Sequence, residues 1–136
     1  MRVLIMKLNP DCVRDILIFL EDNLQISSEL VFEEISYTEL ASQLTYDVRE
    51  IVNTLFAIRE SGFIDCNVDY SLNGLDFFDI YRITYNGYQF IESIRPEPVW
   101  KKVKAVSGNI GSFSFSLISQ IANGVLSSLI SGQLNP

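Results

Sequence analysis

The sequence predicts an α+β protein, a winged helix-turn-helix followed by a C-terminal helical extension. Three observations carry this prediction. Apolar residues recur at helical spacing in the first half of the chain, they alternate with period two after Phe63, and Asn73-Gly74 interrupts the alternation with a strong hairpin signal. The resulting order is helix, strand, helix, helix, hairpin and helix, as in a winged helix. The alternative is another small α+β domain.

The first helix is predicted to begin at Asn9-Pro10. Asn9 is a favourable N-cap, Pro10 suits the first helical position, and Asp11 complements the positive end of the helix dipole. One face of this helix carries five apolar residues at helical spacing, namely Val13, Ile16, Leu17, Leu20 and Leu24. Residues 30–35 are rich in β-forming types and predict a short strand.

Two helices are predicted next. Ser36 and Glu39 form an S-x-x-E capping box, which starts a brief helix through Leu44. Thr45 is expected to cap the following helix, and Gly62 is expected to end it. The second of these helices carries a wide apolar stripe made of Val48, Ile51, Val52, Leu55, Phe56 and Ile58.

The hairpin register follows from pairing Leu72 with Leu75 across Asn73-Gly74. One face of the hairpin is then nearly all apolar, which favours this register. The expected pairs are Tyr70 with Phe77, Cys66 with Tyr81, Ile64 with Ile83 and Asp65 with Arg82. Val68 opposite Asp79 breaks the pattern and predicts a bulge or a longer loop.

After the hairpin, Thr84 is expected to cap a helix with the sequence YNGYQFIESI, which Pro96 and Pro98 break. A short basic helix around Trp100 follows. This gives three segments, an N-terminal extension (1–8), the winged-helix domain (9–104) and an uncharged helical extension (105–136). The residues predicted to be buried together are Leu17, Leu20, Ile51, Leu55, Ile64, Ile83 and Phe90.

Composition argues against an enzyme and against a bound cofactor or metal. The chain has no histidine, so it lacks the commonest general base and the commonest zinc ligand. Its carboxylates are numerous but scattered, and no glycine-containing segment has phosphate-cradle spacing. Cys12 and Cys66 form no C-x-x-C pair and are typical of small hydrophobic residues in a reducing cytosol, with a disulfide as the alternative.

Four stretches resemble a family of small phage and prophage proteins that is known only as a domain of unknown function. They are MKLNPDCVRDIL at the start, the ESGFI helix end, ITYNGYQFIESIR after the hairpin, and VWKKVK. The resemblance covers residues 6–122 and is weakest over residues 26–44. It implies a winged-helix-like plan and a phage context in Gram-positive hosts, and it carries no catalytic or ligand residues.

The charge of the winged-helix segment argues against DNA binding. Residues 8–94 contain four basic and sixteen acidic residues, a net charge of −12, whereas DNA readers neutralise phosphates with Lys and Arg. Acidic residues occupy the start of the candidate recognition helix and the expected wing. The candidate protein-interaction residues in this region are Asp47, Glu50, Asp69, Asp76 and Asp79.

Some residues favour the alternative of a DNA-binding transcriptional regulator that works as a dimer. They are of types that contact phosphates or base edges, and the last three form a basic cluster on the Trp100 helix. This candidate DNA-contact set consists of Thr45, Tyr46, Arg49, Asn53, Lys101, Lys102 and Lys104.

The C-terminal extension has no charged residue between 105 and 136. Pairs of apolar residues recur every four positions, so a broad stripe runs along a helix whose other face is small and polar. Three interpretations compete: packing against the domain, homo-oligomerisation, and membrane contact, for which the helix is too polar to make a typical span. Ser116, Asn123 and Gly124 represent the polar face as candidate interaction residues.

Together these features predict a cytoplasmic, non-enzymatic protein that binds another protein, basic or itself nucleic-acid-binding, as a small regulator or inhibitor. The chain is expected to self-associate through its C-terminal helix. Met6 is an alternative start, which would leave residues 1–5 as a short extension.

Overall fold

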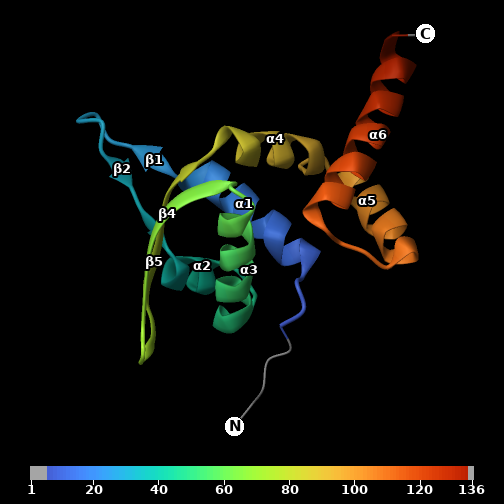
Figure 1. Ribbon diagram of the computed structural model, residues 1–136. Coiled ribbons are helices and arrows are strands. Elements are labelled where there is room, and N and C mark those ends of the chain that lie inside the picture. Colours follow the sequence, from blue (N-terminus) through green and yellow to red (C-terminus); the bar gives the residue numbers. More distant parts are fainter. Residues whose placement is uncertain (1–5, 135–136) are drawn as a thin grey trace. The chain divides into compact units, whose positions relative to one another are not determined.

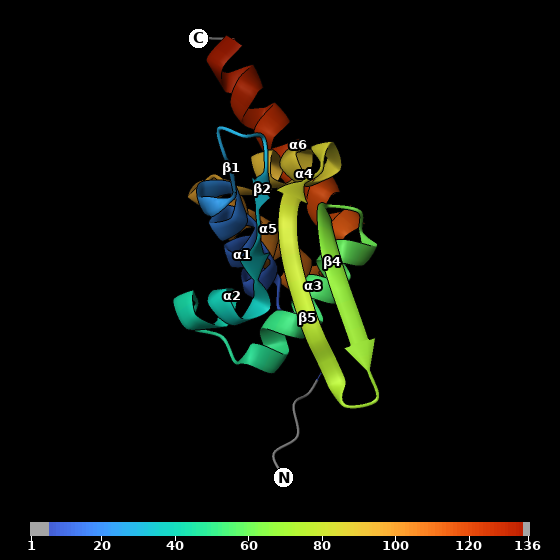
Figure 2. The ribbon, with the colours of Figure 1, turned by 90° about the vertical axis from the view of Figure 1, so that its left-hand side faces the viewer.

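Residues 6–134 are described by a computed structural model, which is α+β (Figures 1 and 2). Six helices and two small antiparallel sheets make up this part of the chain. The chain divides into two compact units, Met1–Tyr88 and Gln89–Pro136. The extension predicted at residues 1–5 lies outside the described residues, and the domain boundaries predicted at 8 and 104 stay predictions.

Helix α1 (Pro10–Asn23) begins as the sequence predicts. The Asn9 side-chain oxygen accepts hydrogen bonds from the backbone N–H groups of Asp11 (3.0 Å) and Cys12 (3.5 Å), which satisfies two donors that the first helical turn leaves open. The face that turns inward is formed by Cys12, Val13, Ile16, Leu17 and Leu20.

The prediction of one continuous strand over residues 30–35 is wrong. Leu30 lies in a turn with φ +64°, and its N–H donates to the Ser27 carbonyl at 2.9 Å. After this turn β2 (Phe32–Glu33) pairs with β1 (Gln25–Ile26), whereas β3 (Ile35–Ser36) joins the second sheet. The β-forming composition correctly indicated an extended chain. The turn, and the switch from pairing with β1 to pairing with β5, depend on contacts with residues far away in the sequence.

Helix α2 (Tyr37–Gln43) is capped by Ser36, whose hydroxyl accepts from the Glu39 N–H at 3.2 Å. The prediction that Thr45 caps α3 (Val48–Glu60) is wrong. Asp47 is the cap, because it lies directly before the helix and its carboxylate accepts from the Arg49 N–H at 2.8 Å. Gly62 ends α3 as predicted, with φ +76° in the left-handed region just past the C-cap.

Strands β4 (Ile64–Ser71) and β5 (Gly74–Ile83) form a hairpin (Figure 2). In the three-stranded sheet the order is β3-β5-β4, so β5 is the central strand and β4 an edge strand. The predicted pairs at the open end, Ile64 with Ile83 and Asp65 with Arg82, are confirmed.

The register predicted beyond these two pairs is wrong. Cys66 pairs with Ile80 and Tyr70 with Leu75, and the two loop residues are Leu72 and Asn73. Two irregularities, between Asp65 and Cys66 and between Asp69 and Tyr70, accommodate the two additional residues of β5.

Helix α4 (Tyr85–Ile94) is capped by Thr84, as predicted. The Thr84 hydroxyl accepts from the Gly87 N–H at 3.1 Å and donates to the Gly62 carbonyl at 2.6 Å. Helix α5 (Glu97–Ile110) contains the buried Trp100 and runs longer than the short basic helix expected there, and α6 (Phe115–Leu134) follows. All seven residues predicted to be buried are buried, with Phe90 in the second unit and the others in the first.

At Gly87, α4 lies against Phe63, which connects α3 to β4, and against Ile83 at the end of β5. A methyl group at this position would overlap the Phe63 carbonyl oxygen and lie 2.8 Å from the Ile83 side chain. We expect Gly87→Ala to lower the free energy of unfolding by about 1–3 kcal/mol, because α4 must shift.

Gly108 in α5 is the matched control, since the nearest atom to an added methyl there is 4.0 Å away. Gly108→Ala should leave stability unchanged or raise it by up to about 1 kcal/mol. Urea unfolding of both variants measures the difference, and equal effects would show that the close contact at Gly87 has no energetic cost.

Candidate functional site: an apolar groove beside helix α3

A groove of about 450 Å³ lies between α3 and the β4–β5 hairpin in the first unit. Successive turns of α3 supply Val48, Val52 and Phe56, and the hairpin supplies Tyr70 and Leu75. Tyr37, at the start of α2, and Met6 complete the apolar lining, and two polar residues of α3, Arg49 and Asn53, also contribute. The groove is therefore formed mainly by the outward side of α3.

Several apolar groove residues are open to solvent. Val48 is 42 % exposed, Tyr70 71 % and Met6 73 %. Phe56 is half-buried, and its ring packs edge-on against the fully buried Phe78 with 5.2 Å between the ring centroids. The groove thus combines a base fixed to the core with an exposed apolar rim, which is the character of a protein-interaction surface.

Two residues of the predicted DNA-contact set, Arg49 and Tyr46, form hydrogen bonds with neighbouring carboxylates. The Arg49 guanidinium makes two 3.1 Å hydrogen bonds to the two oxygens of Asp47, one from Nε and one from Nη2. The Tyr46 hydroxyl donates to Asp15 at 2.6 Å. Burial and this hydrogen bond to a carboxylate raise the pKa of Tyr46 well above its usual value. Thr45 is exposed between α2 and α3, and Asn53 lines the groove.

The three lysines of the DNA-contact set lie in the second unit. Lys101 and Lys102 are exposed on α5, whereas Lys104 is half-buried with its ammonium 6.0 Å from the centre of the Trp100 ring. The structure therefore gathers Arg49 and Asn53 at the groove and places the lysine cluster in a separate unit.

Glu50 and Asp47 have local structural roles at the start of α3. Glu50 accepts a 2.9 Å hydrogen bond from the Asn9 side chain, which ties α3 to the cap of α1. Asp47 caps α3. Asp69 and Asp76 are exposed on the hairpin, and the Ser71 hydroxyl donates to Asp76 at 3.3 Å. None of these carboxylates is among the groove-lining residues.

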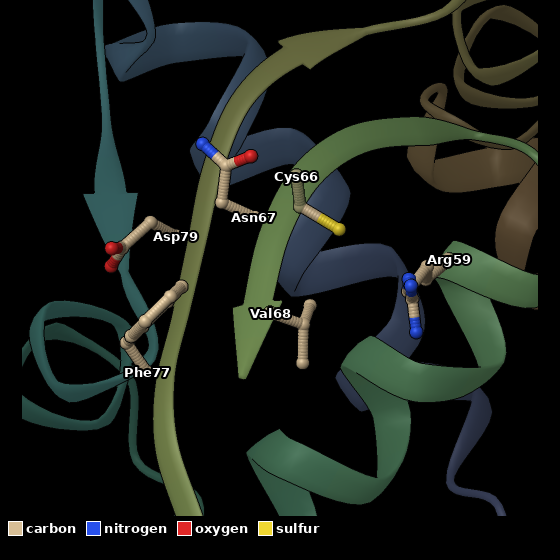
Figure 3. A pocket seen from close by; sticks show the side chains of 6 residues that line it. All are labelled: Arg59, Cys66, Asn67, Val68, Phe77 and Asp79. Atoms are coloured by element: carbon tan, nitrogen blue, oxygen red, sulfur yellow. The ribbon is translucent and has the colours of Figure 1, made fainter. Parts of the chain in front are cut away.

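A second cavity, of about 470 Å³, lies at the edge of the hairpin (Figure 3). Figure 3 shows Cys66 and Val68 on the side of β4 that faces Arg59 of α3, while Asn67, Phe77 and Asp79 point to the other side. The lining residues do not converge on one point, so this cavity has no shared chemical centre.

Asp79 lies near a second carboxylate. Its pKa is raised by burial and by Glu34, which also accepts a 3.0 Å hydrogen bond from the Asn67 amide. Asp79 is therefore a site of electrostatic strain between β5 and the residue that precedes β3.

Both cysteines are free thiols. Burial raises the pKa of Cys12 to about 11, and burial also raises the pKa of Cys66 although Arg59 acts in the opposite direction. Neither environment favours a reactive thiolate. Among residues 6–134 no cluster of three or more His, Cys, Asp or Glu side chains has a geometry that would hold a metal ion.

The groove was not predicted from the sequence. In the sequence, Val48, Val52 and Phe56 belong to a single apolar stripe together with Ile51, Leu55 and Ile58, which are fully buried. A helix that packs one face on a core needs a stripe about 100° wide, and α3 carries more than that. The width of the apolar stripe beyond 100° was the feature of the sequence that could have predicted the groove, because the residues at the outer edge of the stripe line it.

A family model described as "Hypothetical protein (DUF2513)" matches residues 7–114. The chain belongs to this family. The DUF2513 match includes the groove residues from Tyr37 to Leu75 and ends one residue before α6. No curated protein and no solved structure matches the chain.

Asp79→Asn should stabilise this DUF2513 protein at neutral pH. The raised pKa means that ionisation of Asp79 costs more in the folded than in the unfolded state, so stability is lost as pH rises through the folded pKa. We expect the variant to exceed the wild type by up to about 1 kcal/mol at pH 7. The difference should shrink toward zero as the pH falls below the unfolded-state pKa of about 3.9, because the carboxyl then becomes protonated in both states.

Asp69→Asn on β4 is the control, because Asp69 is exposed. It should change stability little at either pH. Urea unfolding at pH 3.5 and pH 7 measures both variants, and an Asp79→Asn protein less stable than the wild type at pH 7 would contradict the assignment of strain.

Proposed function

We propose that this protein is a non-enzymatic winged-helix module that binds a segment of another protein in the groove beside α3. It acts as a small regulator or inhibitor of that partner. Phage or prophage origin and a cytoplasmic location belong to the same proposal and rest on the resemblance of the opening and post-hairpin motifs.

The topology supports the winged-helix assignment. Helix α1, strand β3, helices α2 and α3 and strands β4 and β5 follow one another in the winged-helix order. The short strand β3 lies beside β5, so the strand between the first two helices completes a three-stranded sheet with the hairpin. The β1–β2 pair is an insertion between α1 and β3. In this plan α3 occupies the place of the recognition helix.

The apolar character of the outward side of α3 is the observation that carries the function. A recognition helix that reads DNA presents polar and basic side chains to the major groove. Here the corresponding side presents Val48, Val52 and Phe56, and the hairpin adds Tyr70 and Leu75. Exposed apolar side chains in a defined groove favour a protein ligand over a phosphate backbone.

Charge supports a basic partner segment. Residues 8–94 carry a net charge of −12, from four basic and sixteen acidic residues. Such a field repels nucleic acid and steers a positively charged protein surface toward the groove. We infer that the occupant carries apolar anchors for the groove, flanked by Lys or Arg.

DNA binding as a dimer is the second candidate function. It is favoured by Arg49 and Asn53, which both line the groove and are of types that contact phosphates and base edges. The ion pair between Arg49 and Asp47 weighs against it, because that guanidinium already has a carboxylate partner.

A lysine introduced into the groove distinguishes the two functions. Val48→Lys places a positive charge beside a groove that we expect to receive a basic segment, so binding of the protein partner should fall at least tenfold. The measurement is capture of partners from nuclease-treated lysate of the native host, followed by mass spectrometry. A parallel titration with duplex DNA follows fluorescence anisotropy at two salt concentrations.

Val31→Lys is the matched control, because Val31 is 59 % exposed in the loop between β1 and β2, away from the groove. It should retain the captured protein. If the wild type itself binds duplex DNA, and Val48→Lys raises that affinity and its salt dependence more than Val31→Lys does, the DNA-binding function is correct. Equal capture by both variants would show that the groove is not the binding site.

A further inference from the structure

Helix α6 is longer than the helix it packs on. Both α5 and α6 belong to the second unit, where they pack on each other, and a short connection of residues 111–114 joins them. With 1.5 Å of rise per residue, the 14 residues of α5 span about 21 Å and the 20 residues of α6 about 30 Å. Figure 1 shows the C-terminal part of α6 extending past α5.

Burial falls along α6 accordingly. Ile118 and Ala122, in its first half, are 1 % and 0 % exposed, whereas Leu129 and Ile130 are 53 % and 56 % exposed. The apolar stripe predicted from sequence is therefore covered only in its first half. The second half presents apolar side chains that α5 leaves exposed.

A groove of about 350 Å³ lies next to this exposed half. Four of its lining residues, Ile121, Gly124, Val125 and Ser128, stand at positions i, i+3, i+4 and i+7 of α6. This spacing forms the four-residue hole that receives a side chain from a facing helix. Gly124 and Ser128 are small, so a facing backbone can approach closely, and no atom lies within 4 Å of a methyl group built on Gly124. Leu129 stands at the edge of the same groove.

The absence of charge on α6 indicates what fills the groove. No charged residue occurs between positions 105 and 136, while the whole chain carries a net charge of −7. Two copies of an acidic protein repel one another over most of their surfaces, and α6 is a surface on which that repulsion is weakest. Among residues 6–134, Lys102 of α5 is the one charged residue that lines the groove. A partner protein with a charged surface would gain little electrostatic attraction from α6 itself.

A membrane is a poorer occupant. By length and composition alone Phe115–Gln133 could cross a bilayer, and 11 % of this stretch is buried. However, ten of the twenty residues of α6 are Ser, Gln, Asn or Gly, whereas a spanning helix needs about 20 mostly apolar residues. A helix that lies on a membrane surface carries Lys or Arg on its polar face, and α6 has neither.

We propose that two copies of this chain pair through α6, in antiparallel orientation about a two-fold axis. Leu129 of each copy fills the hole that Ile121, Gly124, Val125 and Ser128 form in the other. The knob and the hole line one groove, so a two-fold axis beside that groove exchanges them between the two copies, as an isologous contact requires. This contact differs from the polar face expected from sequence, because Gly124 lines the hole while Ser116 and Asn123 lie outside it.

Sedimentation equilibrium of the full chain tests the proposal over a concentration series. The wild type should reach twice the chain mass of 15.5 kDa. Leu129→Ser should weaken dimerisation at least about tenfold, since each of two holes loses its apolar side chain. Ile130→Ser is the matched control, because Ile130 is equally exposed but lies outside the groove, and it should leave the dimer intact.

A second pair of variants uses charge in place of apolar contact. Ser128→Lys puts an ammonium group into each hole, where Lys102 already lines the groove, and should give a monomer, whereas Asn123→Lys should not. Circular dichroism confirms that the helices persist in all four variants. A wild type that stays monomeric at high concentration overturns the proposal, as does equal weakening by Leu129→Ser and Ile130→Ser. Co-flotation of the wild type with phosphatidylcholine vesicles, lost in Leu129→Ser, would assign the groove to a membrane and overturn it also.

Discussion

The packing of α3 is the constraint on which the rest of the first unit depends. Ile51, Leu55 and Ile58 on its inner side are fully buried. Its start is held by the Asp47 cap, and the Glu50 hydrogen bond to Asn9 ties that start to α1. With the inner side buried and the start anchored, the outer side has a fixed position relative to the hairpin. The groove is the consequence of this arrangement, since its base is held by the contact of Phe56 with the core.

Much of the fold was predictable from sequence where the determining interaction is local. The caps at Asn9, Ser36 and Thr84 are each made by a hydrogen bond to a backbone N–H two or three residues away, so the signal and its effect lie in the same short stretch. The end of α3 at Gly62 is of the same kind. The Thr45 error is also local: two residues could serve as caps, and the one adjacent to the helix does so.

The errors that remain come from interactions between distant residues. The hairpin register depends on where β5 accommodates two additional residues, which no local pattern specifies. The division of residues 30–35 depends on β3 pairing with β5, about 45 positions later. The groove was missed for a related reason, because an apolar stripe shows that a helix is covered but does not show how much of it the fold covers.

The two units have contrasting surface chemistry, which matters for the proposed activities. The first unit is strongly acidic and opens an apolar groove, whereas the second ends in the uncharged α6. Acidic surroundings select partners by charge, and neutral surfaces allow like chains to meet. Separate surfaces for a foreign partner and for a second copy would give a dimer with two groove sites, which raises avidity for a partner that presents its segment twice.

Site-specific photo-crosslinking from the groove tests the central claim most directly. Tyr70 lines the groove and is 71 % exposed, and Tyr85 on α4 is 74 % exposed and lies outside it. Benzoylphenylalanine can therefore replace either tyrosine, because its additional benzoyl group can extend into solvent. Irradiation in the native host should give a nuclease-resistant protein adduct from position 70 and none from position 85. An adduct from position 70 that nuclease digests, or equal adducts from both positions, would contradict the account.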